Sequence, residues 1–405
     1  MWAGFALAAA ALAAPKALET SSAALSAPPQ EVVTRHPLYS SVPSDEAVSK
    51  LLSKVGAGCC RDLICSECTT LEKVLNSSKL EWPDKGLDDD DARVLAYVIS
   101  VSEHLMILHL NHNDIGDPGT AAIAEVLKVN TVLGILQFEF NRVGDAGAIA
   151  FGEMLRVNTR LRILNFNSNR IGDAGGVALG NALAVQAVEE TDREDNRLNA
   201  RIQKIELNYN KIGDAGGVAI GKALGVNAVL RVLHLGHNQV GDATAIAIAN
   251  SLRGNSTVLR VLYISTNYIG HPGGVAIGEM MHVNTAMQDL NIASNDIGDP
   301  GAVAIAGALR VNPAMYKLSL RLNNISNEGA VAIAGALVVN KVLVEFYCGG
   351  NHYSKESKQI LKDAVAGREA REGRAGMGEV PFNEPHPDAL PLSERSLISR
   401  AGDEI

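Results

Sequence analysis

The fold is decided by the stretch LMILHLNHNDIGD, residues 105–117. Its leucines and asparagine return with the same spacing, mostly after 28 residues, and nine copies follow one another along the chain. The asparagines of these copies are Asn113, Asn141, Asn169, Asn210, Asn238, Asn267, Asn295, Asn323 and Asn351. An imperfect earlier copy surrounds Leu80 and Leu87, with Lys85 in place of the asparagine. Self-similarity at a fixed period of this length indicates a repeat architecture.

Each copy predicts a strand followed by a helix. Apolar and polar residues alternate over Leu108-His109-Leu110, as they do in a half-buried strand. An apolar residue, a glycine and an aspartate then precede a run of small residues, and we expect the aspartate to cap the helix that follows it. Two copies depart from this pattern, with His271 and Asn327 at the aspartate position. Strand–helix units of this kind require parallel pairing, because each strand returns in the same direction.

The pattern L-x-x-L-x-L-x-x-N-x-I-G-D-x-G-x-x-A-I-A-x-x-L resembles the leucine-rich repeats of the ribonuclease-inhibitor-like subfamily, over roughly residues 71–365. The resemblance implies an α/β leucine-rich-repeat horseshoe solenoid, with a parallel sheet on the concave face and helices on the convex face. It also implies that the recurring asparagine satisfies backbone groups of the loops. Three G-x-x-x-G pairs are interpreted as places where a helix packs closely on the sheet: Gly176 and Gly180, Gly217 and Gly221, Gly274 and Gly278.

Five parts are expected along the chain. Residues 1–43 are a disordered or targeting segment, residues 44–104 an N-terminal helical cap with the degenerate first repeat, and residues 105–353 the nine repeats. A capping helix over 354–372 and a disordered tail over 373–405 follow. A polar insertion at 187–200 breaks the array, either as a functional loop or as a solvated insertion without a role. We expect a cytoplasmic protein, or a secretory or organellar one if residues 1–17 are a cleaved targeting peptide.

Composition excludes several classes of function. A net charge of -9 argues against a general nucleic-acid binder, and no apolar run is long enough to predict a membrane span. The cysteines of the N-terminal cap could bind a metal, form a disulfide or remain ordinary thiols, and the last is favoured: Cys59, Cys60, Cys65 and Cys68. The chain contains no phosphate-binding loop and no H-E-x-x-H or G-x-S-x-G motif. We therefore expect no enzyme, no catalytic residue, no cofactor and no bound metal.

The concave face is the expected binding surface, because a horseshoe presents there a broad and rigid area to a protein partner. Its outward positions are Phe140, Lys204, Glu206, Tyr209, His234, His237, Tyr263, Arg321 and Tyr347. Tyrosine and arginine are enriched at binding hot spots, although a solvated sheet face without a hot spot is the alternative.

The sequence therefore predicts a non-catalytic scaffold that binds a partner protein. The alternative is a GTPase-activating regulator similar to the Ran GTPase-activating proteins, with a small GTPase as the partner. Those proteins resemble this one in repeat length but carry an acidic C-terminal tail. Here arginines alternate with acids in the tail, so none of that family's functional residues is carried over: Arg374, Arg395 and Arg400.

Overall fold

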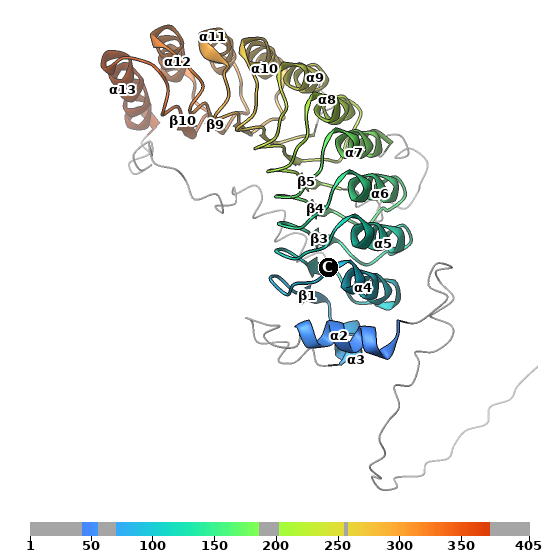
Figure 1. Ribbon diagram of the computed structural model, residues 1–405. Coiled ribbons are helices and arrows are strands. Elements are labelled where there is room, and N and C mark those ends of the chain that lie inside the picture. Colours follow the sequence, from blue (N-terminus) through green and yellow to red (C-terminus); the bar gives the residue numbers. More distant parts are fainter. Residues whose placement is uncertain (1–42, 56–69, 186–201, 255–257, 373–405) are drawn as a thin grey trace, which may run out of the picture.

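The computed structural model describes residues 43–55, 70–185, 202–254 and 258–372 (Figure 1). Within these ranges ten parallel strands form one open sheet, in the order of the sequence. The strands are β1 (Lys79–Glu81), β2 (Ile107–His109), β3 (Ile135–Gln137), β4 (Ile163–Asn165), β5 (Lys204–Glu206), β6 (Val232–His234), β7 (Val261–Tyr263), β8 (Asp289–Asn291), β9 (Lys317–Ser319) and β10 (Glu345–Tyr347). The predicted horseshoe solenoid is confirmed: the strands line the inner, concave side of an arc and the helices its outer side.

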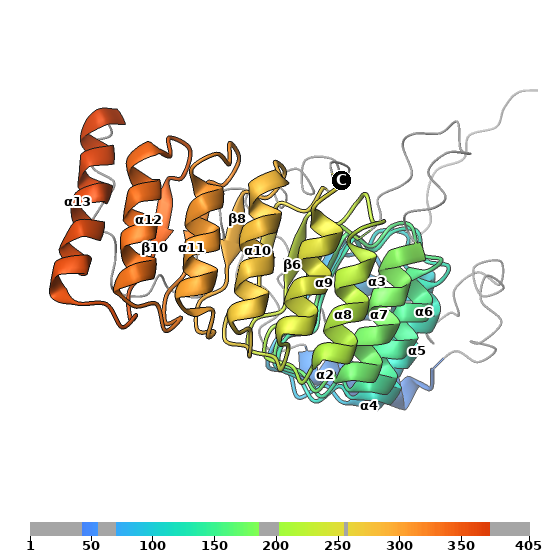
Figure 2. The same cartoon turned by 90° about the horizontal axis from the view of Figure 1, so that it is seen from above.

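The helices stand side by side along the outer face (Figure 2). They are α4 (Asp89–Val101), α5 (Asp117–Leu127), α6 (Asp145–Leu155), α7 (Asp173–Val185), α8 (Asp214–Ala223), α9 (Asp242–Leu252), α10 (His271–Val283), α11 (Gly298–Leu309) and α12 (Asn327–Val339). Helices α2 (Asp45–Val55) and α3 (Leu71–Leu75) precede the array, and α13 (Lys355–Glu372) follows it. None of the described helices is long and apolar enough to cross a membrane.

The central residue of each strand builds the core. Leu108 pairs in register with Leu80 on one side and with Leu136 on the other, and all three side chains are buried. The same pairing continues to Phe346 in β10. Because side chains alternate across a strand, the two flanking residues of each strand face the concave side. The hydrophobic pattern therefore fixes both the register and the face that is left for binding.

The recurring asparagine has the structural role that the resemblance implied. Asn113 donates from Nδ2 to the carbonyl oxygens of Trp82 and Leu110, each at 2.9 Å, and its Oδ1 accepts from the backbone N–H groups of Lys85 and Leu87 at 3.0 Å. Equivalent bonds recur in the following repeats. The side chain thus satisfies loop groups of its own repeat and of the preceding one.

A second row of buried asparagines was missed by the sequence analysis. Asn158 follows α6, donates to the carbonyl oxygen of Leu127 at 2.6 Å and accepts from the N–H groups of Arg160 and Leu161. The same arrangement recurs at Asn130, Asn227, Asn284, Asn312 and Asn340. The sequence contained a signal for them, because all six follow a valine and recur with the repeat.

The aspartate at the start of each helix does not cap that helix, and this prediction was wrong. In α5 the N-cap is Gly116, and Asp117 is already the first helical residue. Its Oδ1 instead accepts from the N–H groups of Gly144 and Gly147 in the next repeat, at 2.6 and 2.9 Å. The carboxylate therefore joins two repeats, because it supplies the acceptor that the following helix's first turn lacks.

The G-x-x-x-G pairs are also corrected. A Cβ on Gly180 would lie 2.6 Å from the carbonyl carbon of Ala219 in α8, and one on Gly278 would lie 2.6 Å from that of Ala304 in α11. These glycines therefore allow two neighbouring helices to approach each other, rather than a helix and the sheet. Several expectations lie outside the described residues: those for 1–42, the four N-terminal cysteines, the insertion at 187–200 and the tail at 373–405.

Candidate functional site

Two rows of side chains cover the concave face, one on each side of the buried central residues. The first row is Lys79, Ile107, Ile135, Ile163, Lys204, Val232, Val261, Asp289, Lys317 and Glu345. The second row is Glu81, His109, Gln137, Asn165, Glu206, His234, Tyr263, Asn291, Ser319 and Tyr347. Lys79 and Glu81 of β1 pair with each other, and Glu81 also lies beside His109 of β2. Isoleucines occupy the first row from β2 to β4, and ionisable residues are concentrated again from β5 to β10.

Around β5 and β6 the charged side chains pair with one another. Glu206 lies 3.4 Å from Lys204 Nζ and 3.3 Å from His234 Nδ1, and the His234 ring stacks on Tyr263 with centroids 4.4 Å apart. Burial raises the pKa of Glu206, but the hydrogen bond from His234 and the charge of Lys204 outweigh it, so that the pKa lies below its usual range. The structure thus brings together four of the residues expected on the concave face.

Two of these four residues offer little surface to a partner. Lys204 and His234 are only 4% and 5% exposed, although the alternation of the strands predicted both as outward positions. Their side chains do point to the concave face, but those of neighbouring strands lie against them and cover them. Lys204 and His234 are therefore corrected to supporting positions beneath the accessible surface.

A second network continues towards β10. Tyr263 donates its hydroxyl to Asp289 at 2.9 Å, and Lys317 Nζ lies 3.9 Å from Asp289 and 3.3 Å from Glu345. Tyr347 donates to Glu345 at 3.1 Å, and burial together with the charge of Glu345 raises the pKa of Tyr347 to about 12. Ionisable groups that pair in this way hold one another in place, which gives the face a fixed shape.

A third row, which we call the αL row, lies beside the concave face where the loops leave the strands. It consists of the residue before each recurring asparagine, and of the residue before Lys85 in the imperfect first copy: Asp84, His112, Phe140, Ser168, Tyr209, His237, Thr266, Ser294, Leu322 and Gly350. All ten have φ between 52° and 75°, in the left-handed region. Bulky residues are uncommon in that region, so the repeat geometry imposes the conformation on whatever residue stands there.

Aromatic rings in the αL row are exposed and stacked. Phe140 and Tyr209 are 50% and 54% exposed. The His112 and Phe140 rings stack with centroids 4.4 Å apart and an interplanar angle of 19°, and those of Tyr209 and His237 at 3.9 Å and 13°. Burial lowers the pKa of His237, which favours the neutral ring. Large exposed side chains on a fixed backbone are suited to contact a partner.

The remaining predicted site residues have intermediate exposure. Glu206, His237, Tyr263, Arg321 and Tyr347 are partly buried. Arg321 stands two residues after β9, and its backbone carbonyl accepts from Ser294 at 2.7 Å. His112 and Leu322 also belong to the accessible surface and were missed, although both stand directly before a recurring asparagine, where the period could have located them.

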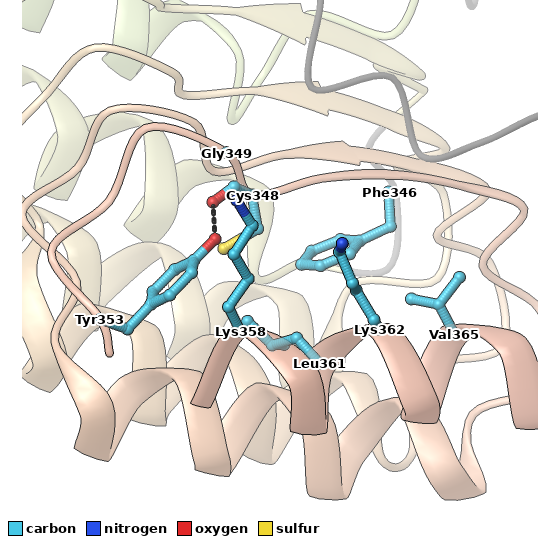
Figure 3. Close-up of a pocket in the computed structure, with 8 residues that line it drawn as sticks. All are labelled: Phe346, Cys348, Gly349, Tyr353, Lys358, Leu361, Lys362 and Val365. Atoms are coloured by element: carbon cyan, nitrogen blue, oxygen red, sulfur yellow. Dashed lines mark hydrogen bonds between the residues drawn. The ribbon is translucent and has the colours of Figure 1, made fainter. Parts of the chain in front are cut away.

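A pocket at the C-terminal end of the array lies between β10 and α13 (Figure 3). Phe346, Cys348, Leu361 and Val365 are among the residues that line it, and Tyr353 donates its hydroxyl to the Cys348 carbonyl oxygen at 2.6 Å. Burial raises the pKa of the Cys348 thiol to about 12, so the thiol stays protonated. Among the described residues no three His, Cys, Asp or Glu side chains are grouped as metal ligands would be.

Comparison with known proteins supports the repeat assignment. A family model described as "Leucine Rich repeat" matches residues 101–124, 129–152, 157–180, 199–221, 226–249, 283–306 and 312–334. No curated protein matches the chain. Similar solved structures include the actin-binding site 2 of leiomodin-1, at 17% identity over 56% of this chain and 96% of that chain, with a TM-score of 0.30. They also include an internalin (inlF) from Listeria monocytogenes, at 17% identity over 78% of this chain and 92% of that chain, with a TM-score of 0.38.

Each matched segment contains one strand of the sheet and the beginning of the helix that follows it. The strands that these segments supply pair in the same register as their unmatched neighbours β7 and β10. The recurring units of this chain are therefore leucine-rich repeats, and the parallel solenoid is the fold that they build.

Proposed function

We propose that the chain is a non-catalytic scaffold that binds a partner protein through the concave face and the adjoining αL row. Leucine-rich repeats are in general protein-interaction modules, and the subfamily that these repeats resemble is the ribonuclease-inhibitor-like one. The observation that carries the proposal is the exposure of Phe140 and Tyr209 on a backbone fixed by the repeat. Preorganised aromatic side chains lose little conformational freedom on binding, so more of the contact energy remains as affinity.

The charged part of the concave face supports this surface. Glu206 and Asp289 are held by basic and hydroxyl groups of the same strand or of a neighbouring one, as described above. A partner that covers this face meets groups whose charges are already compensated, which reduces the free-energy cost of removing water from them. In the proposal these residues give the surface its shape, and the αL row supplies the main contacts.

Affinity capture with mass spectrometry tests the proposal. The wild-type chain is compared with a Phe140→Ala/Tyr209→Ala double variant and with Tyr268→Ala, a control that removes a 73% exposed tyrosine outside the three rows. We expect a partner that the wild type and the control retain and the double variant loses. Equal capture by all three proteins would refute a role of the αL row.

The same experiment tests the alternative function, in which the chain regulates GTP hydrolysis. This alternative rests on the resemblance to the Ran GTPase-activating proteins. In that case the captured partner is a small GTPase, and adding the chain accelerates its hydrolysis of GTP. A cytoplasmic location is part of the proposal, and fluorescence imaging of the tagged full chain tests it.

A further inference from the structure

The aromatic side chains of the αL row are interrupted at one position. Phe140, Ser168 and Tyr209 follow the consecutive strands β3, β4 and β5, which pair in register. The row itself is also continuous, because Phe140 donates its N–H to Asn167 at 3.1 Å and Ser168 donates to Asn208 at 2.8 Å. Ser168 therefore occupies the position at which a ring would connect the two stacked pairs.

In each stacked pair the ring nearer to Ser168 is stacked on one face only. One face of Phe140 is covered by His112 and one face of Tyr209 by His237. Since the rings stack along the row, the opposite faces of Phe140 and Tyr209 look along the row towards Ser168. Two strand spacings separate these rings by about 9.5 Å, so a group midway would lie about 4.8 Å from each. We call this space the Ser168 slot, bounded by Phe140, Ser168 and Tyr209.

The residue next to Phe140 carries a carboxylate. Glu139 precedes Phe140, and its Oε2 accepts from Asn165 Nδ2 at 3.4 Å. Because Asn165 is the last residue of β4, this contact draws the carboxylate from the β3 repeat towards the repeat that carries Ser168. Two aromatic faces and a negatively charged side chain are thus contributed by neighbouring repeats.

We propose that the Ser168 slot binds an arginine side chain of the partner protein, an inference that rests on the function proposed above. A guanidinium midway between the rings lies within the roughly 6 Å at which a cation interacts with a ring face, and it does so with both rings. Its planar shape stacks on aromatic faces, which the compact ammonium of lysine does not do. The negative charge of Glu139, the residue next to Phe140, favours a cation over a neutral ring.

Nuclear magnetic resonance with a small probe tests the proposal on the full chain. The probe is N-acetyl-arginine methylamide, and the matched probe is the lysine analogue. We expect the δ-methylene signals of the arginine probe to move upfield and to saturate, because the methylene next to the guanidinium enters the shielding region of both rings. The lysine analogue should bind at least about fivefold more weakly. Phe140→Leu and Tyr209→Leu should each reduce the affinity by at least about fivefold, since each removes one ring face.

Two further variants complete the design. Ser168→Arg fills the slot from within the chain and should abolish binding of the probe, whereas Tyr268→Leu should leave it unchanged. No saturable shift, equal binding of the two probes, or an affinity unaffected by both leucine variants overturns the arginine assignment.

The two proposals fail in different ways. Loss of the captured protein in the Phe140→Ala/Tyr209→Ala variant, with no binding of the arginine probe, would overturn the slot and leave the scaffold function standing. Capture that is unaffected by that double variant would overturn the scaffold function through the αL row itself.

Discussion

Replacing Asp214 with alanine should loosen the helix of the next repeat rather than its own. Asp214 opens α8, but its Oδ1 accepts from the N–H of Gly241 at 2.8 Å and from the N–H and hydroxyl of Thr244 at 3.1 and 2.7 Å. Loss of a helix cap costs about 0.5–2 kcal/mol, and hydrogen bonds to a charged group lie at the upper end of that range or above it. For this partly exposed carboxylate with three donors we expect about 2 kcal/mol.

Hydrogen exchange followed by mass spectrometry measures this effect where it occurs. A local cost of about 2 kcal/mol corresponds to roughly a 30-fold faster exchange of the amides at the start of α9. Peptides that cover residues 240–246 should therefore exchange faster, while those that cover 212–218 should change little. Asp214→Asn keeps an acceptor oxygen without the charge and should produce a smaller increase. Faster exchange confined to 212–218 would show that Asp214 caps its own helix and would refute the inter-repeat assignment.

Three further predictions follow from the same contacts. Burial raises the pKa of Asp214 and Asp299, but the hydrogen bonds that they accept outweigh it and lower both pKa values. The stability that these carboxylates contribute is therefore complete above about pH 4 and is lost as the pH falls through the lowered pKa values. Unfolding followed by circular dichroism should show this loss of stability in acid, and it should be smaller in the Asp214→Asn/Asp299→Asn variant. In urea denaturation, Gly180→Ala should destabilise the chain by about 1–3 kcal/mol, because the added Cβ meets the backbone of the adjacent helix. Gly307→Ala should stabilise the chain by about 0.5–1 kcal/mol, because no atom lies within 4 Å of the added Cβ. Iodoacetamide at pH 8 should leave Cys348 unmodified in the folded chain and alkylate it in denaturant, as peptide mass spectrometry will show, because the thiol is buried and its pKa is about 12.

The strand register could be predicted because it is a property of single repeats. Most copies place a leucine at the centre of the strand, and its position relative to the other leucines and the asparagine of the same repeat shows which side chain must be buried. Contacts between repeats are different, since their partners stand a full period apart. Asp117 illustrates this: its position before a helix is typical of a cap, and only the structure shows that Gly144 and Gly147 of the following repeat are its donors.

Exposure on the concave face could be predicted only in part for the same reason. Alternation along β5 and β6 correctly directs Lys204 and His234 to that face, but their burial depends on what the neighbouring strands place beside them. The ring of Tyr263 covers His234, and Glu206 lies against both buried residues. Phe140, Tyr209 and His237 were predicted as site residues, but the left-handed conformation of the αL row was missed. Such a backbone is usually signalled by glycine or asparagine, and Phe140 and Tyr209 carry no such signal.

Our proposal places function at positions where the repeats differ. Most positions with a structural role keep their residue type from repeat to repeat, and where one changes, the backbone responds. At His271 the inter-repeat aspartate is missing, and Gly298 of the next repeat has a φ of 56°, whereas Gly116 in an ordinary repeat has -101°. The αL row behaves differently: its backbone is constant while its side chains range from serine to phenylalanine. A side chain that varies on an invariant backbone is not needed for folding, and for this reason our proposal assigns the main partner contacts to the αL row, including the position of Ser168.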